Sequence, residues 1–225
     1  MFKYLLPIFG NFYYYLPLIY TLTLVSIVYS SLICLRINHI KQIVAYLSIV
    51  HMSFSVLGLF INQYTGITGM VFSMFSHSLV SSGLFFLIGG LYSKYGSYYI
   101  EECRGLYYNM PIFSFFMVFL CFATLAIPLT SSFIAEFLIL VDLLKYNMFV
   151  SSILFLYYVL QTGSVVWLMN RLLFTDVALN KHSIRTYVQY KDLSNVEFVY
   201  LSIFCFLILL FGINPNLVGL HDLIS

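Results

Sequence analysis

Three ionisable side chains lie inside apolar stretches of the sequence, where each could bind and release a proton. His51 lies in "YLSIVHMSF", His77 in "MFSHSLV" and Glu136 in "IPLTSSFIAEFLIL". In a membrane-spanning helix, an ionisable residue is costly to insert and is a functional hypothesis by default. Burial and a nearby helix N-terminus act on a carboxyl group in opposite directions, which can leave Glu136 able to exchange a proton near neutral pH. The chemistry that these residues indicate is proton transfer.

Hydroxyl side chains accompany both histidines at helical spacing. Ser48 and Ser55 share a helix face with His51, and serines lie one turn to either side of His77. Each histidine is about ten residues into its predicted helix, or about 15 Å, which is close to the membrane midplane. One interpretation is a hydrated path for protons. The other is that small hydroxyl residues allow close helix packing and satisfy a buried imidazole.

Glu136 lies in a predicted span, residues 111–144, that is too long for one straight crossing. As a continuous helix it would measure about 51 Å, against about 30 Å for the hydrocarbon core. Pro128 has no N–H and its ring clashes with the preceding turn, so it predicts a break. The hydroxyl residues that we expect to cap the restarted helix are Thr130, Ser131 and Ser132. The alternative for Glu136 is a purely structural bond to a neighbouring helix.

The composition indicates an all-α, polytopic membrane protein. Of 225 residues, 62% are hydrophobic and only 8% are charged, far below the charged fraction of about a quarter in soluble domains. We find no Ser/His/Asp arrangement, phosphate-binding loop, metal-spaced His/Cys set or dinucleotide fingerprint in the sequence. Four scattered cysteines read as small hydrophobic residues rather than ligands or disulfides. Redox or hydrolytic chemistry on this chain is therefore not expected.

The sequence predicts one membrane domain, residues 1–225, with about six crossings. These are residues 16–35, 40–61, 67–91, 111–144, 149–174 and 197–212. Six crossings place alternate loops on opposite sides of the membrane. One side receives eight of the ten basic residues: Arg36, Lys41, Lys94, Arg104, Arg171, Lys181, Arg185 and Lys191. The other receives Lys3 and Lys145. The positive-inside rule then predicts that the eight-charge side faces the cytoplasm or organelle matrix, with both termini on the other side.

The motifs around the three ionisable residues resemble the antiporter-like membrane-arm subunits of respiratory complex I. "RINHIKQIVAYLSIVHMSF" resembles the family pattern R-x-x-D-x-K-x-x-I-A-Y-S-S-V-x-H-M, and "LAIPLTSSFIAEFLILV" resembles the broken helix. "MFSHSLVSSGLFFLIGGLY" and "RGLYYNMPIFS" are similar to the intervening helix and loop. Within the family the similarity is greatest to subunit 4 of the mitochondrial enzyme, because the broken helix carries an acid where subunits 2 and 5 carry lysine.

The resemblance implies a role for each candidate residue. His51 and Glu136 would belong to the central chain of protonatable residues along the membrane arm, and His77 would occupy a half-channel or connecting position. The residues expected to support this relay are Lys41, Ser48, Ser55, Pro128, Ser131 and Ser132. No cofactor is expected in this chain, apart from bound phospholipid. FMN, iron–sulfur clusters and ubiquinone are expected in other subunits, and the location is expected to be the mitochondrial inner membrane.

Several positions depart from the family pattern. His39 replaces the aspartate before Lys41, and Leu129 and Ala135 replace glycines beside the break, which predicts a tighter or differently shaped break. The resemblance covers only the last six helices of a longer unit, so the expected interpretation is the C-terminal piece of a split subunit 4. Its expected partners are the chain with the other half, antiporter-like subunits 2 and 5, accessory subunits and lipid; no nucleic acid is expected.

Two other functions remain open from the sequence. The large subunits of multi-component cation/proton antiporters share these motifs, and sodium-dependent transport without NADH-linked activity would favour that function. A membrane anchor without transport activity would explain the hydrophobicity, but it would leave His51, His77 and Glu136 without a purpose.

Overall fold

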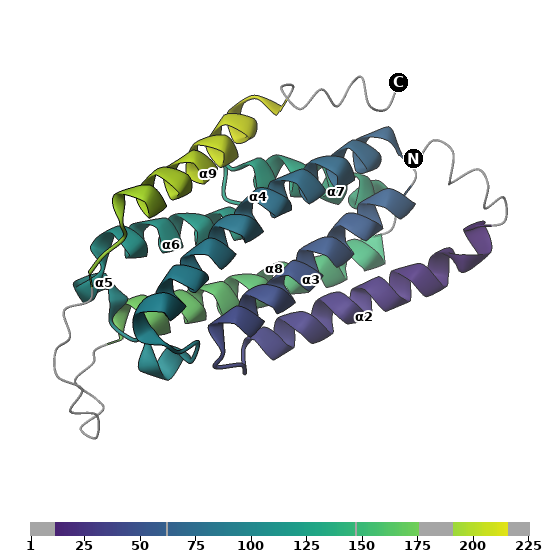
Figure 1. The fold of residues 1–225 in the computed structure, drawn as a ribbon. Helices are drawn as coiled ribbons and strands as arrows, with labels where there is room; N and C mark the ends of the chain where they lie inside the picture. The colour runs from purple at the N-terminus through teal and green to yellow at the C-terminus, as the bar shows by residue number, and fades with distance from the viewer. Residues whose placement is uncertain (1–11, 62, 147, 176–190, 216–225) are drawn as a thin grey trace.

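The computed structural model describes residues 12–61, 63–146, 148–175 and 191–215 (Figure 1). The predicted all-helical membrane fold is confirmed. In chain order the elements are η1 Phe12–Tyr15, α2 Leu16–Cys34, α3 Ile40–Phe60, α4 Tyr64–Tyr95, η2 Ile100–Glu102, α5 Leu106–Asn109, α6 Pro111–Thr124, α7 Ser131–Tyr146, α8 Met148–Met169, the π-helical turn η3 Asn170–Phe174 and α9 Asn195–Ile213. The only β-type pairing among the described residues is an isolated bridge between His39 and Tyr99.

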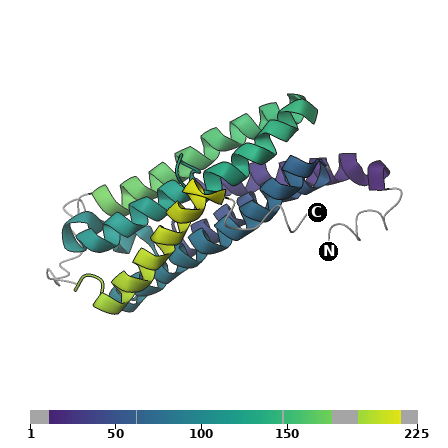
Figure 2. The same cartoon turned by 90° about the horizontal axis from the view of Figure 1, so that it is seen from above.

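Among the described residues, five helical segments are long and apolar enough to cross a membrane. They are α2, α3, α4, α8 together with η3, and α9. The remaining predicted crossing is the pair α6 and α7, of which α6 is a shorter apolar helix. Seen from above, α6, α7 and α8 form one layer and α2, α3 and α4 another, with α9 lying obliquely across α4 and α6 (Figure 2). The residues at which we expect each of the six crossings to enter and leave the membrane stay a prediction.

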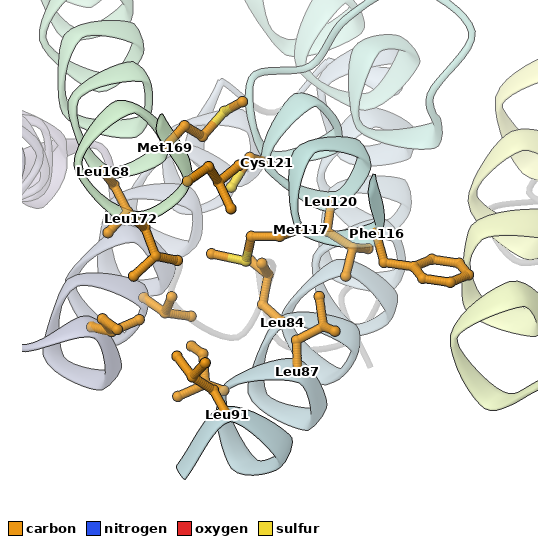
Figure 3. Close-up of a cluster of buried hydrophobic side chains, with 14 of the residues drawn as sticks. Leu84, Leu87, Leu91, Phe116, Met117, Leu120, Cys121, Leu168, Met169 and Leu172 are labelled. Atoms are coloured by element: carbon orange, nitrogen blue, oxygen red, sulfur yellow. The ribbon is translucent and has the colours of Figure 1, made fainter. Parts of the chain in front are cut away.

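Apolar side chains fill the space between the two layers. The largest buried cluster joins α3, α4, α6 and α8, and its members include Leu84, Leu87, Leu91, Phe116, Met117, Leu120, Cys121, Leu168, Met169 and Leu172 (Figure 3). A second buried cluster joins α2, α3, α7 and α8 around Phe54 and Tyr157. The polar site described below lies where these layers meet.

The loops that carry most of the basic residues meet at one end of the bundle. The Ile100 N–H donates to the Asn38 carbonyl at 2.9 Å, and Arg171 Nη1 donates to Asn38 Oδ1 at 3.4 Å. The Asp192 carboxylate accepts from the Ile112 N–H at 2.9 Å. The first two bonds connect the α2–α3 loop to the segment after α4 and to the end of α8, and the third connects the start of α6 to the residues before α9. Lys3, Lys181 and Arg185 lie outside the described residues.

Helix α8 ends in the π-helical turn, where one extra residue is accommodated per hydrogen-bonded ring. Here the Arg171 guanidinium lies 4.6 Å from the centre of the Trp167 ring. A guanidinium over an indole face is a favourable cation–π contact. The turn therefore places Arg171 where it can contact both Trp167 and the loop between α2 and α3.

Candidate functional site

The predicted helix break at Pro128 is confirmed. Helix α6 ends at Thr124 and α7 begins at Ser131, with six non-helical residues between them. Two residues of this segment, Ala126 and Leu129, have φ angles of 51° and 81°. A left-handed conformation costs a residue with a β-carbon about 1–2 kcal/mol. Leu129 therefore adopts the conformation that favours glycine, even though it is not one.

Hydroxyl groups beside the break bond in a different direction from the one we predicted. The Ser132 hydroxyl donates to the Ala123 carbonyl, and Thr130 Oγ1 donates to the Ile127 carbonyl at 2.7 Å. We expected these hydroxyls to cap N–H groups of α7. They satisfy carbonyl groups instead: Ala123 in the last turn of α6, where the break removes the helical N–H partner, and Ile127 within the break. Ser131 is fully buried, and its hydroxyl has no hydrogen-bond partner among the described residues.

The close packing of two other helices fixes the position of the break. Gly212 of α9 lies directly against the Leu129 carbonyl, so a β-carbon at position 212 would overlap this group. Ala135 is fully buried, and its carbonyl oxygen would lie 3.1 Å from a β-carbon added at Gly69 of α4. The backbone that leads into Glu136 is thus held by α9 at Leu129 and by α4 at Ala135.

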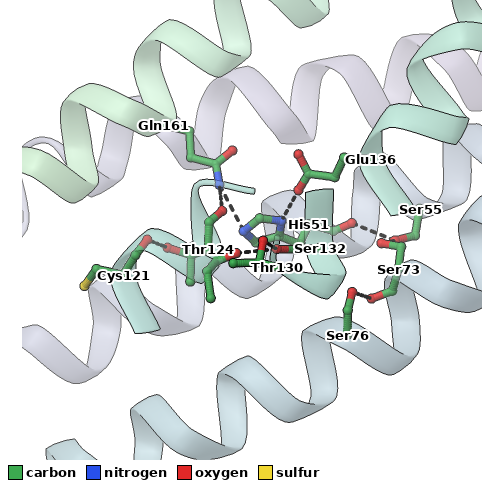
Figure 4. Close-up of polar contacts among 11 residues, drawn as sticks. His51, Ser55, Ser73, Ser76, Cys121, Thr124, Thr130, Ser132, Glu136 and Gln161 are labelled. Carbon is green, nitrogen blue, oxygen red and sulfur yellow. Dashed lines mark hydrogen bonds and ion pairs between the residues drawn. The ribbon is translucent and has the colours of Figure 1, made fainter. Parts of the chain in front are cut away.

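His51 and Glu136 form a buried pair at the centre of the site. His51 Nδ1 lies 3.1 Å from Glu136 Oε1, although the two residues are far apart in the sequence (Figure 4). Only 6% of His51 and 4% of Glu136 are exposed. The sequence placed both residues in one proton path but did not predict their direct contact. Glu136 Oε2 has no hydrogen-bond partner among the described residues.

Gln161 of α8 completes the surroundings of the imidazole. Its Nε2 lies 3.0 Å from His51 Nε2 and 2.8 Å from the carbonyl oxygen of Thr124, the last residue of α6 (Figure 4). Gln161 is 2% exposed. We noted this residue only as a polar, non-titratable group near the middle of its span. The available signal was an amide at the depth of a predicted buried histidine, which needs a partner for each ring nitrogen.

His77 lies beside the pair but not in contact with Glu136. Its ring centre is 5.4 Å from that of His51, and the side chain is half-buried. A small cavity separates these groups, with about 10 Å³ available to the centre of a water molecule, close to the space that one water needs. The cavity is lined by His51, Ser73, Ser76, His77, Val80, Ala123, Thr124, Ser132 and Glu136.

The remaining predicted residues divide into two groups. Ser55 belongs to the site: its hydroxyl lies 2.7 Å from the Ser73 hydroxyl and donates to the His51 carbonyl at 2.9 Å. Ser48 bonds to the Ala45 carbonyl of its own helix and is only half-buried, so its hydroxyl does not contact the pair. Lys41 lies near the start of α3, 5.6 Å from the centre of the Tyr98 ring, in the basic end of the bundle.

A second buried carboxylate, Asp142, was overlooked in the sequence although it falls within the predicted broken span. Asp142 is fully buried, and Oδ2 accepts a hydrogen bond from the Thr65 hydroxyl. Thr65 is in the first turn of α4, where the helix dipole favours a negative charge. Its companion oxygen Oδ1 has no partner among the described residues. Because Asp142 bonds to the N-terminal turn of α4, it indicates an anchor between α7 and α4, away from the His51–Glu136 pair.

Comparison with known sequences gives one family. The family model described as NADH:quinone oxidoreductase/Mrp antiporter, transmembrane, matches residues 1–162. NADH-ubiquinone oxidoreductase chain 4 of Acanthamoeba castellanii is 41% identical, over 95% of this chain and 42% of that relative. NADH-quinone oxidoreductase subunit M of Rickettsia typhi is 35% identical, over 87% of this chain and 38% of that relative. The chain thus spans about two fifths of the length of the curated relatives it matches.

Solved structures show the same fold. A chain of respiratory complex I from Thermus thermophilus aligns with a TM-score of 0.88 and 24% identity, over 99% of this chain and 46% of that one. A chain of the Mrp complex from a Dietzia species aligns with a TM-score of 0.79 and 15% identity, over 91% of this chain and 45% of that one. The broken helix, the buried acid and the match over residues 1–162 agree, and the chain belongs to the NADH:quinone oxidoreductase/Mrp antiporter transmembrane family.

Proposed function

We propose that this chain relays protons in the membrane arm of a proton-translocating NADH:ubiquinone oxidoreductase. The observation that carries this proposal is the buried pair of His51 and Glu136, whose atoms are 3.1 Å apart beside a helix break. An imidazole and a carboxylate within hydrogen-bond distance can exchange a proton directly. Burial matters because water would otherwise exchange protons with both groups and uncouple them from the rest of the arm.

The cavity extends the path from His51 toward α4. A water molecule there would bridge the imidazoles of His51 and His77, whose ring centres lie 5.4 Å apart. The hydroxyls of Ser76 and Ser132 also line this space and can orient such a water. The proposed order along the path is therefore His77, water, His51 and Glu136.

Electrostatic coupling would drive protons along this path. At an effective dielectric constant of about 20, a unit charge about 10 Å away changes the energy of a buried charge by about 1.7 kcal/mol. This corresponds to more than a tenfold change in proton occupancy. A change of charge elsewhere along the membrane arm, caused by quinone reduction, would thus be enough to load or empty the His51–Glu136 pair.

The rest of the machinery would lie outside these helices. FMN, iron–sulfur clusters and ubiquinone would be held by other subunits, and the chain would contact antiporter-like subunits 2 and 5, accessory subunits and lipid. It would also work with the segment that corresponds to the first half of its longer relatives, whichever chain carries it. The proposed location is the mitochondrial inner membrane, with the basic end of the bundle facing the matrix and both termini on the opposite side.

Replacement of Glu136 by Gln tests the proposal. The amide keeps the shape and one acceptor but cannot bind the transferred proton, so we expect fewer protons moved per NADH oxidised, with assembly unchanged. The measurement is vesicle acidification against NADH oxidation, with native-gel separation as the assembly control. Asp142→Asn is the matched control, because it removes a buried carboxylate from the same helix outside the pair. Normal pumping by an assembled Glu136→Gln variant would refute the proposed role.

A second candidate function is supported by the fold match to the Mrp complex. In that case the chain would belong to a cation/proton antiporter and would carry out sodium-dependent transport without NADH oxidation. Native-gel separation of mildly solubilised membranes, followed by mass spectrometry of the band that contains this chain, separates the two. Comigration with NADH-oxidising activity supports the first function, and comigration with antiporter components without a flavin subunit supports the second.

A further inference from the structure

The Gln161 amide faces two groups that together fix its orientation. The carbonyl oxygen of Thr124, 2.8 Å away, can only accept a hydrogen bond. The amide nitrogen must therefore point toward it, since the amide oxygen there would place two acceptors in contact. The Thr124 carbonyl is available for this bond because α6 ends at this residue. The helix break thus determines which way the Gln161 amide points.

The same nitrogen assigns the tautomer of His51. Gln161 Nε2 carries a second hydrogen and lies 3.0 Å from His51 Nε2. As Gln161 donates, His51 Nε2 accepts and carries no proton. In a neutral imidazole the proton is then on Nδ1, which faces Glu136 Oε1 at 3.1 Å. The contact between His51 and Glu136 therefore depends on an amide that touches neither carboxylate oxygen.

We propose that Gln161 is a positioning residue that keeps the His51 proton on Nδ1, facing Glu136, and that passage of a proton through the ring requires rotation of the Gln161 amide. This inference rests on the proposed relay function. A proton that crosses the ring leaves protonated His77 through the cavity water and binds to His51 Nε2, while the Nδ1–H bond breaks and an O–H bond forms on Glu136. No electrons are transferred. During this step the new Nε2–H and the amide N–H would face each other, since both are donors.

Rotation of the amide removes this conflict but creates another. The amide oxygen, which has no partner among the described residues, would then accept from His51 Nε2–H. It would also face the Thr124 carbonyl at the position where the amide nitrogen now donates. The rotated state is therefore less stable, and the amide returns when the Nε2 proton has moved to Nδ1, a transfer that cavity water can carry. Gln161 thereby separates two steps, transfer to Glu136 and reloading of His51, and opposes a continuous leak of protons.

Two contacts favour a proton on His51 Nδ1: an ionised Glu136 accepts from Nδ1–H, and Gln161 donates to Nε2. Glu136 of α7 faces Nδ1, and His77 of α4 lies across the cavity. Tyr157 of α8 is fully buried, and its hydroxyl interacts with the Gln161 side chain. Among the described residues, Gln161 is the one hydrogen-bond partner of His51 Nε2.

Two substitutions in the assembled complex test this assignment. Gln161→Glu replaces the donor by an acceptor, so His51 Nε2 should be protonated. We expect the alkaline limb of the pH profile of coupled turnover to move up by about one unit. Gln161→Met removes the donor with little change in length, and we expect about a tenfold lower coupled rate with an unchanged KM for NADH. Thr162→Val is the matched control, because its hydroxyl is exposed and bonds only to the Tyr158 carbonyl of its own helix.

Failure of the inference can be distinguished from failure of the proposed function. If Glu136→Gln lowers pumping while both Gln161 variants keep the wild-type rate and pH profile, the relay stands and the role of Gln161 is refuted. If the Gln161 variants do not assemble, the nitrogen resonances of His51 in the ¹⁵N-histidine-labelled wild-type complex decide. A protonated Nδ1 with an unprotonated Nε2 supports the assignment, and the reverse overturns it.

Discussion

Substitution of Gly69 by Ala should weaken the contact that positions Glu136. A β-carbon at Gly69 would lie 2.9 Å from Ile139 Cγ1, 3.0 Å from Leu138 Cβ and 3.1 Å from the Ala135 carbonyl oxygen. Ile139 is fully buried, and the other two atoms are held by the backbone of α7. Relief of these contacts therefore requires α4 and α7 to separate by several tenths of an ångström.

The expected change in the free energy of unfolding follows from two opposing effects. In a helix, replacement of Gly by Ala gains about 1 kcal/mol from backbone propensity. Overpacking of a close contact costs about 1–3 kcal/mol. At Gly89 of the same helix an added β-carbon meets nothing within 4 Å, so only the gain applies. The free energies of unfolding of Gly69→Ala and Gly89→Ala should thus differ by about 1–3 kcal/mol, with Gly69→Ala the less stable.

The assay is the temperature at which the chain leaves its assembly. Solubilised membranes are heated in steps and separated on native gels, and the fraction of chain that stays assembled is measured. We expect Gly89→Ala to match or exceed wild type and Gly69→Ala to fall below it. Gly163→Ala serves as a second control, since position 163 is also free of contacts within 4 Å. Equal midpoints for Gly69→Ala and Gly89→Ala would refute the packing argument.

Three further outcomes are expected. Leu129→Gly should leave the midpoint of thermal dissociation unchanged or raise it, because a φ of 81° strains leucine but not glycine. Leu129→Val should lower this midpoint, and equal midpoints for the two variants would argue against strain at position 129. Asp142→Leu should lower the midpoint by losing the Thr65 bond, whereas Asp142→Asn should not, and reduced pumping in assembled Asp142→Asn would contradict an anchoring role. Burial raises the pKa of Cys103 to about 12, so below that pH it stays a protonated thiol. Alkylation of Cys103 in the folded protein, followed by mass spectrometry, should be slow at pH 7 and rise about tenfold per pH unit.

The helices and the break were predictable because each depends on a local signal. Long apolar runs with few charges indicate membrane helices whatever their neighbours are. Pro128 predicts a break because its missing N–H and its ring act within one turn. The depth of Glu136 and both histidines followed from counting residues along predicted helices, and the structure places His51 and Glu136 together in the interior.

The contacts of the site were not predictable in the same way. Gln161 and His51 come from helices far apart in the chain, and only the packing of α8 on α3 and α6 brings the amide to the ring. The direction of the Ser132 hydroxyl depends on a carbonyl freed nine residues earlier. Asp142 could have been noticed, as it is a second acid in an apolar span, but its bond to Thr65 required the tertiary fold.

The π-helical turn after α8 makes this segment sensitive to a change in residue number rather than in residue type. Loss of a single residue between Asn170 and Phe174 would let the backbone continue as an ordinary α-helix, so the hydrogen-bond ladder itself would survive. Because a π-turn holds one residue more than an α-turn, the residues after the deletion would keep nearly the same direction around the helix axis. The change would fall on the residues of the turn itself, where Arg171 contacts Trp167 and Asn38. A one-codon deletion here would leave the hydropathy of the span almost unchanged but would alter the contact between the end of α8 and the loop between α2 and α3.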